Sequence, residues 1–234
     1  MWGKILRSIE TPRGPSATDL VFGELYRRIV ELELPPGTKL SEQEVARQMG
    51  ISRQPVRDAF YRLSQLGLIL IQPQRATTVS LISEEAVLQA RFVRTALETE
   101  TARLLARRLD AADLAELERL IAAQEAAMAA GDRVGFHALD DEFHQAISRA
   151  SGNGHAWAII RDNKAHMDRV RYLSLGFNAA SALADHRDIL AALTSRDPER
   201  AAEAMRRHLS RIVDLISQIR AENPAMFADP GEAP

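Results

Sequence analysis

The spacing of apolar residues predicts α-helices over most of the chain. From residue 18 to about residue 32, and through most of residues 84–221, apolar side chains recur at every third or fourth position. This spacing places them on one face of an α-helix. Only two short β-rich runs, 68–71 and 77–81, favour strands, and they flank a turn segment at 73–76. We therefore expect a mainly α-helical protein with one β-hairpin.

Residues 41–67 have the pattern of two short helices joined by a tight turn. Ser41 is a good N-cap for the first helix, and Gly50 stands where a left-handed residue ends a helix. Ser52 is the N-cap of the second helix, which stops at Gly67. The pattern predicts a helix-turn-helix. The apolar positions expected to face its core are Val45, Met49, Val56, Ala59, Phe60 and Leu63.

The outer side of the second helix carries Arg53, Gln54 and Arg57 near its start. A recognition helix meets base edges and phosphates at this position, where Arg can bind guanine and Gln can bind adenine through paired hydrogen bonds. Ser52 and the free N–H groups of the first turn suit a phosphate. The hairpin that follows is then a wing, with Arg75 at its tip in reach of the minor groove or a phosphate. A solvated basic face on an ordinary helical hairpin has the same pattern, so the helices alone leave both interpretations open.

The segment ISRQPVRDAF resembles the core motif of GntR-type bacterial transcription regulators, and the preceding PPGTKLSEQEVARQMG is similar to the start of their winged helix-turn-helix. The resemblance implies that Ser52, Arg53, Gln54 and Arg57 contact DNA. Two positions depart from the family pattern. Gln54 replaces the usual Thr, and Gln43 stands where many members carry an Arg that touches DNA. We expect an altered base preference and a weaker contact at these two positions.

The chain of 234 residues divides into four expected segments. A loose N-terminal arm (1–17) precedes a winged helix-turn-helix domain (18–82), an all-α bundle (83–221) and a disordered tail (222–234). A break is expected at residues 176–178, where Gly and Asn interrupt the apolar pattern. The bundle then has about six helices, at 84–109, 110–130, 132–150, 155–175, 181–193 and 198–221.

Composition and charge narrow the class of protein. Hydrophobic residues make up 46% of the chain and aromatic residues 5%, which favours packed helices, and the absence of Cys excludes disulfides and thiolate metal sites. Residues 1–80 hold 11 basic and 8 acidic side chains (+3), and the remainder holds 19 and 24 (−5). This asymmetry fits a basic DNA-contacting domain and an acidic second domain. No apolar run approaches the roughly twenty residues of a membrane span, and the first residues have no long apolar centre or small-residue cleavage site, so we expect no export signal. We expect a cytoplasmic protein without a membrane partner.

Acidic and imidazole side chains of the expected bundle are candidates for a metal site. Asp140 and His144 are four residues apart on one helix face, and the pairs Asp185-His186 and Arg207-His208 belong to two later helices. Imidazole and carboxylate groups are ligands of zinc, nickel and manganese. Scattered His residues usually serve as caps or surface hydrogen-bond partners, so spacing alone does not decide between a metal site and these roles.

The order D-x-x-x-H, then D-H-R, then M-x-x-H-L resembles the FCD ligand-binding domain attached to one large group of GntR regulators. The resemblance implies a divalent metal, zinc before nickel or manganese, beneath a pocket for a small organic acid. The metal ligands it implies are Asp140, His144, His186 and His208. The residues expected around the acid, where a guanidinium is the natural partner of a carboxylate, are Arg94, Asn163, Arg169 and Arg171.

Other polar residues near these positions are expected to have different roles. We interpret Glu98 as half of a surface salt bridge. Asp141 and His137 flank the metal-binding face and are the nearest alternatives as ligands, with His137 expected in an outer or surface position. His155 and His166 have no partner pattern and are expected to be structural or exposed.

These patterns together predict a homodimeric, ligand-responsive transcription regulator that binds double-stranded DNA at a palindromic operator. One alternative is a metal-dependent enzyme acting on a small carboxylic acid, although no nucleophile or acid–base pair is evident beyond the metal ligands. A second alternative is a metal- or ligand-binding module that has lost DNA binding, against which the intact SRQPVR segment argues.

Overall fold

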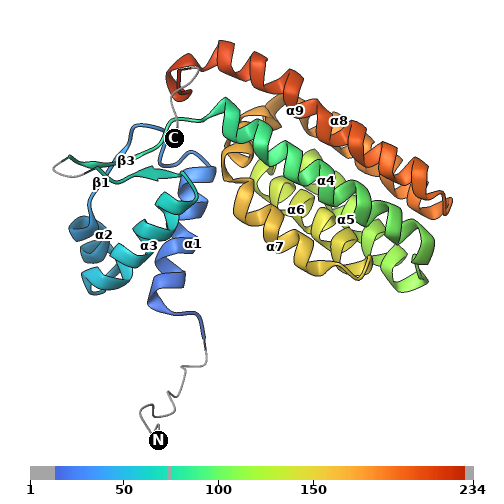
Figure 1. The fold of residues 1–234 in the computed structure, drawn as a ribbon, viewed down its shortest axis with the longest axis horizontal. Helices are drawn as coiled ribbons and strands as arrows, with labels where there is room; N and C mark the ends of the chain where they lie inside the picture. Colours follow the sequence, from blue (N-terminus) through green and yellow to red (C-terminus); the bar gives the residue numbers. More distant parts are fainter. Residues whose placement is uncertain (1–13, 73–74, 230–234) are drawn as a thin grey trace, which may run out of the picture.

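The computed structural model describes residues 14–72 and 75–229, which form a small N-terminal domain and a larger helical bundle (Figure 1). The small domain lies at one end of the bundle, beside the C-terminal end of the last helix. Most of the expected N-terminal arm falls outside the described residues. None of the helices in the described part of the chain combines the length and the hydropathy of a membrane span.

The N-terminal domain is a winged helix-turn-helix, as the sequence predicts. β3 pairs antiparallel with both other strands, so the strand order is β1-β3-β2. The β2–β3 hairpin was expected, but β1 was not, because two residues are too few to show an alternating pattern. The elements are α1 (Ala17–Val30), β1 (Lys39–Leu40), α2 (Glu42–Met49), α3 (Arg53–Gln65), β2 (Ile69–Leu70) and β3 (Thr77–Val79).

Local capping and one shared core hold this domain together. The Oγ atom of Ser16 caps α1 and accepts the Asp19 N–H at 3.1 Å. Gly50 ends α2 at φ 66°, a left-handed conformation that glycine adopts without strain. Met49 is 37% exposed, so the prediction that it faces the core is wrong, and Ala46 is buried in α2 instead. The core joins α1, α3 and the sheet through Val21, Leu25, Ile29, Val56, Ala59, Phe60, Leu63, Leu68 and Val79.

The bundle has six helices in the described residues, and α4 contacts α6, α7, α8 and α9. Asp110, Asp132 and Asp197 cap the helices that follow them with their side chains. The main core of the bundle includes Leu105, Leu117, Leu120, Phe143, Ile147, Leu183, Ile189 and Met205. The helices are α4 (Glu84–Arg108), α5 (Ala111–Ala129), α6 (Arg133–Ala150), α7 (Gly154–Asn163), α8 (Ala165–Thr194) and α9 (Pro198–Glu222).

Two predicted boundaries in the bundle are wrong. The chain does not break at residues 176–178, because α8 continues through Gly176. The break falls at Lys164 instead, between α7 and α8. A Cβ atom at Gly176 would lie 3.3 Å from Nη2 of Arg133. This glycine therefore gives room for a neighbouring guanidinium rather than ending a helix.

The segment after α9 packs against the joint between the two domains, although a disordered tail was expected from residue 222. A 3₁₀ turn, η1 (Pro224–Met226), follows α9. Phe227 then forms a parallel bridge with Ile82 and is 6% exposed. Residues 230–234 lie outside the described part of the chain.

The first turns of α8 fasten the N-terminal domain to the bundle. Arg169 is fully buried and donates from Nη1 to the Ser80 carbonyl oxygen at 2.7 Å. The Nδ1 atom of His166 accepts the Ser83 N–H at 3.1 Å, and its Nε2 lies 3.1 Å from the Gly67 carbonyl oxygen. We call this group of contacts the domain joint. It fixes the wing and the end of α3 against α8.

Candidate functional site

The start of α3 presents two arginines to solvent. Arg53 and Arg57 are one helical turn apart, and their side chains are 60% and 59% exposed. Each approaches Oε2 of Glu42, at 3.3 Å and 3.5 Å respectively. Exposed pairs of this kind contribute little to stability. Both guanidiniums are therefore available to a polyanion.

The remaining predicted DNA contacts also lie on the surface of this domain. Ser52 is exposed, and its hydroxyl forms no capping hydrogen bond with α3. Gln54 donates to Asp58 Oδ1 at 2.9 Å, and Gln43 is exposed on α2. Arg75 is exposed and lies 3.3 Å from Gln72 Oε1, while residues 73–74 at the wing tip are outside the described part of the chain.

The bundle brings together the four predicted metal ligands. Asp140 and His144 come from α6, His186 from α8 and His208 from α9. One ligand atom from each lies within 4.8 Å of the other three. The first three residues are buried and His208 is nearly so. Residues from three separate helices therefore converge on one point inside the bundle.

A second layer of acceptors orients the three imidazoles. The Nδ1 atom of His144 lies 2.5 Å from Glu98 Oε2 on α4. The Nδ1 atom of His186 lies 2.7 Å from the Gln124 side-chain oxygen on α5. The Nδ1 atom of His208 lies 3.4 Å from Asp185 Oδ2. Partners of this kind fix the tautomer and the ring orientation of metal-binding histidines.

The orientation of the rings leaves their Nε2 atoms facing one another. The Nδ1 atoms of His186 and His208 form hydrogen bonds with acceptors, and that of His144 lies against Glu98, so each neutral ring is assigned its proton on Nδ1 and a lone pair on Nε2. The Nε2 atoms of His144 and His208 are 3.2 Å apart, and Nε2 of His186 is buried with no hydrogen-bond partner among the described residues. Lone pairs this close repel one another unless a cation lies between them. The donor set therefore fits a divalent metal with nitrogen and carboxylate ligands.

Electrostatics keep the ligands in the protonation states that a metal requires. Burial lowers the pKa of His186 well below its usual range and also lowers the pKa of His208. Burial alone would raise the pKa of Asp140, but Arg171 and the imidazoles outweigh it and hold the pKa well below normal. A metal needs neutral imidazoles and an ionised carboxylate. All three shifts favour these states.

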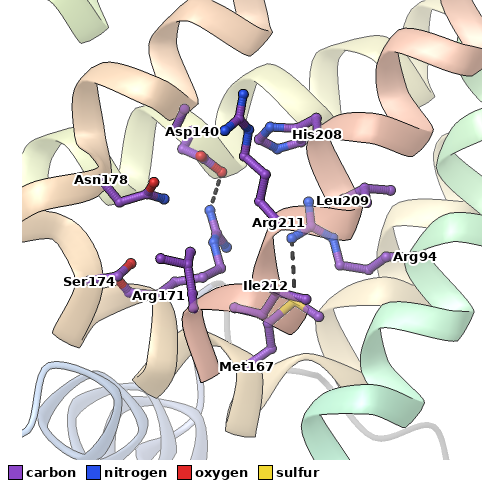
Figure 2. A pocket seen from close by; sticks show the side chains of 12 residues that line it. Arg94, Asp140, Met167, Arg171, Ser174, Asn178, His208, Leu209, Arg211 and Ile212 are labelled. Carbon is purple, nitrogen blue, oxygen red and sulfur yellow. Dashed lines mark hydrogen bonds and ion pairs between the residues drawn. The ribbon is translucent and has the colours of Figure 1, made fainter. Parts of the chain in front are cut away.

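A cavity of about 60 Å³ borders the metal ligands (Figure 2). Arg94 and Arg171 line it together with Ser174, Asn178 and Arg211. Figure 2 shows Arg171 pointing toward Asp140, which it contacts through Nη2. The cavity is far below the roughly 300–1,000 Å³ of drug-sized ligand sites. Its size and its guanidiniums fit a small anion.

Two of the predicted effector residues do not lie at this cavity. Arg169 belongs to the domain joint, where backbone carbonyl groups hold its guanidinium. Asn163 is exposed at the end of α7 and donates to the Ile159 carbonyl oxygen at 2.7 Å. Their positions do not support a role in effector binding. Arg94 and Arg171 remain the predicted residues that line the cavity.

The interpretation of Glu98 as a surface residue is wrong. It is 1% exposed and lies between Arg94, at 2.5 Å, and His144. Burial would raise the pKa of Glu98, but Arg94 and His144 hold it well below normal. The sequence reasoning also missed Gln124, whose only signal was a polar residue on the apolar face of α5.

The alternative ligands lie outside the cluster of four. Asp141 accepts from Lys164 at 2.7 Å and from Arg171 at 3.1 Å. His137 is largely buried, 3.8 Å from Asp168, so it lies in an outer position as expected. His155 is exposed, and His166 is structural, as the domain joint shows.

Comparisons with known proteins agree with this architecture. A family profile of bacterial regulatory proteins of the gntR family matches residues 17–79, and an FCD domain profile matches residues 89–211. The HTH-type transcriptional repressor RspR of Escherichia coli is 37% identical over 226 residues, which cover 95% of this chain and 99% of that protein. A probable D-xylose utilization operon transcriptional repressor of Paenarthrobacter nicotinovorans is 31% identical over 80% of this chain and 82% of its own.

A solved structure supports the same assignment. The Escherichia coli protein McbR/YncC superposes with a TM-score of 0.75 at 26% identity, over 88% of this chain and 99% of its own. These relatives are transcription regulators, so the alternative of an enzyme is rejected. The chain belongs to the gntR family of bacterial regulatory proteins, in the group that carries an FCD domain.

Proposed function

We propose that this regulator binds operator DNA through the start of α3 and that a small organic acid, bound beside a divalent metal in the bundle, controls this binding. The observation that carries the proposal is the exposure of Arg53 and Arg57 at the N-terminal end of a recognition helix. Ser52, Gln54 and Gln43 add exposed polar groups to the same domain, and Arg75 adds a positive charge on the wing. A recognition helix uses such groups to contact phosphates and base edges.

The metal would be held by Asp140, His144, His186 and His208, with zinc expected before nickel or manganese. Support comes from the converging Nε2 atoms and from the acceptor behind each imidazole. A bound divalent ion would act as a Lewis acid toward a carboxylate of the effector. Arg94 and Arg171, which line the cavity, would bind or orient the same anion.

We further propose that two copies of the chain bind a palindromic operator as a homodimer. Paired recognition helices related by a two-fold axis match two half-sites on DNA. Repression is the expected direction of control, since two of the relatives are named repressors.

Selection of operator sequences from random duplex DNA tests the DNA-binding proposal. The wild-type chain is expected to enrich an inverted repeat whose half-sites are separated by about one helical turn. Arg119→Ala is a suitable control, because Arg119 is an exposed arginine of the bundle that pairs only with Glu116 among the described residues. It is expected to enrich the same sequence. Failure of the wild-type protein to enrich any sequence would refute specific DNA recognition.

Elemental analysis tests the metal proposal. Wild-type protein is expected to retain about one divalent ion per chain after gel filtration, and a His186→Ala, His208→Ala double variant is expected to lose it. His155→Ala removes an exposed imidazole and is expected to keep the ion. Equal metal content in the double variant and in the wild type would refute the site.

A further inference from the structure

The first turns of α8 contact the N-terminal domain and the bundle cavity at the same time. Ala165 packs in the core of the N-terminal domain, and Met167 lines the cavity beside the metal ligands. Asp168 follows directly and is 1% exposed. This short segment is therefore the place where the two domains and the proposed metal site meet.

The two carboxylate oxygens of Asp168 have different partners. Oδ1 lies 3.0 Å from Arg171 Nη1 within α8. Oδ2 accepts a hydrogen bond from the Tyr26 hydroxyl, at 3.4 Å, and lies 2.5 Å from Lys164 Nζ. Tyr26 belongs to α1, whose buried face packs on the recognition helix α3. One carboxylate thus joins the bundle to the DNA-binding domain.

Arg171 continues this connection to the metal ligands. Its Nη2 atom contacts Oδ2 of Asp140, while Nη1 serves both Asp168 and Asp141. The guanidinium is planar and rigid, so a shift of one of its nitrogens moves the other. Side chains with little freedom therefore connect Asp140 to Asp168.

We propose that Asp168 is a positioning residue that couples the metal site to the DNA-binding domain, through Arg171 to Asp140 on one side and through Tyr26 to α1 on the other. This coupling rests on the metal site of the proposed function. It adds the chain of contacts through which metal binding affects the position of α1.

A cation at the cluster changes the balance of charges along this route. The cation neutralises part of the negative charge of Asp140 and so weakens the attraction between Asp140 and Arg171. The positive charge of Arg171 is then balanced mainly by Asp168 and Asp141. Asp168 is then held more firmly as the acceptor for Tyr26. Metal binding is therefore expected to stabilise the docked position of α1, and α1 docking must favour metal binding by the same factor.

Tyr26→Phe is the sharpest test of this route. The substitution removes one hydroxyl and keeps the ring, which packs beside Phe22. The domain joint at His166 and Arg169 holds the domains together independently, so the variant is expected to fold and stay docked. Tyr172→Phe is the matched control, since it removes the hydroxyl of a partly buried tyrosine of α8 that forms none of the contacts described for Asp168.

Hydrogen exchange of the full-length protein, with and without zinc, measures the coupling. The metal is first removed with a chelator and zinc is then restored, and elemental analysis gives the zinc content of each sample. Zinc is expected to slow exchange of the α1 amides by about fivefold or more in the wild type and in Tyr172→Phe. Tyr26→Phe is expected to bind the same amount of zinc and to lose most of this protection.

Two results would overturn the proposal. One is zinc binding to the wild type with unchanged or faster exchange in α1, and the other is equal protection of α1 in Tyr26→Phe. Either result leaves the metal site and DNA binding intact as separate conclusions. A wild-type protein that takes up no zinc would refute the metal site itself and the coupling with it. DNA is absent from the experiment, so a failure of DNA recognition does not affect the outcome.

Discussion

Replacement of His166 by Gln is expected to remove part of the acid sensitivity of the fold. His166 is buried in the domain joint, where its Nδ1 accepts from the Ser83 N–H and from Arg169. Its Nε2–H donates to the Gly67 carbonyl oxygen. Burial, and secondarily the charge of Arg169, lower the pKa of His166 from 6.5 to about 3. Neutral His166 therefore belongs to the folded state.

The size of the effect follows from the difference in proton binding. The folded-state pKa is depressed, so between about pH 3 and the unfolded value of 6.5 the unfolded chain binds the proton and the folded protein does not. The stabilisation is fully present above pH 6.5 and is lost as the pH falls toward 3. Each pH unit below 6.5 costs about 1.4 kcal/mol. At about pH 5.5 the wild type should have lost about 1.4 kcal/mol through this residue.

Chemical denaturation at about pH 7.5 and about pH 5.5 measures this loss. Gln offers a neutral donor and acceptor of similar reach, so His166→Gln is expected to fold and to lose about 1.4 kcal/mol less than the wild type between the two pH values. His155→Gln changes an exposed imidazole on α7 and should behave like the wild type. The metal ligands are the same in all three proteins, so their contribution to the pH dependence of the unfolding free energy cancels in the comparison. An equal loss in His166→Gln and in the wild type would refute the assignment of a neutral, buried His166.

Three further substitutions test the metal site, the core of the N-terminal domain and the wing. Glu98→Gln weakens the acceptor behind His144 and is expected to reduce zinc affinity by about 10- to 100-fold in a chelator competition, and unchanged affinity would contradict its orienting role. Leu63→Ala opens a cavity at a fully buried position of α3 and should cost about 2–5 kcal/mol in the free energy of unfolding of the N-terminal domain, whereas a cost near zero would place Leu63 outside the core. Arg75→Ala is expected to weaken operator binding and to lower the slope of log K against log salt by about one, and an unchanged slope would exclude a phosphate contact from the wing.

The N-terminal domain could be predicted from the sequence because its signals are local. Ser41 and Gly50 lie next to the helix ends that they define, and the stripe from Val56 to Leu63 has the period of the helix it belongs to. The structure confirms each of them. The exception is Met49, where tertiary packing selected the smaller Ala46 for the buried position.

The errors in the bundle arise where tertiary contacts override local preference. A glycine within an apolar pattern indicates a break, yet Gly176 lies within α8 beside the Arg133 guanidinium. The local sequence around Lys164 marks the actual break only weakly, because Asn163 is present but no Gly or Pro. Phe227 forms a bridge with Ile82 near the domain joint, although the composition of its segment is typical of a flexible tail.

In the candidate site too, residues close together in the sequence could be predicted, whereas contacts between residues far apart in the sequence could not. The pair Asp140 and His144 follows from helix geometry, and His186 and His208 were visible on later helices, but only the resemblance to a family combined the four into one ligand set. Glu98 looked like a surface ion pair because a spacing of four residues from Arg94 is typical of exposed helix faces. The sequence could not show that α4 is covered by four other helices, which buries both residues.

The binding of operator DNA by an Arg53→Ala, Arg57→Ala double variant shows whether the start of α3 contacts DNA. Fluorescence anisotropy with the operator selected by the wild type, at one stated salt concentration, gives the affinity, and circular dichroism checks the fold. The two substitutions together are expected to weaken binding by about 100-fold or more, with helix content unchanged and with Arg119→Ala binding as the wild type does. Wild-type affinity in the folded double variant would contradict the claim that the start of α3 contacts DNA.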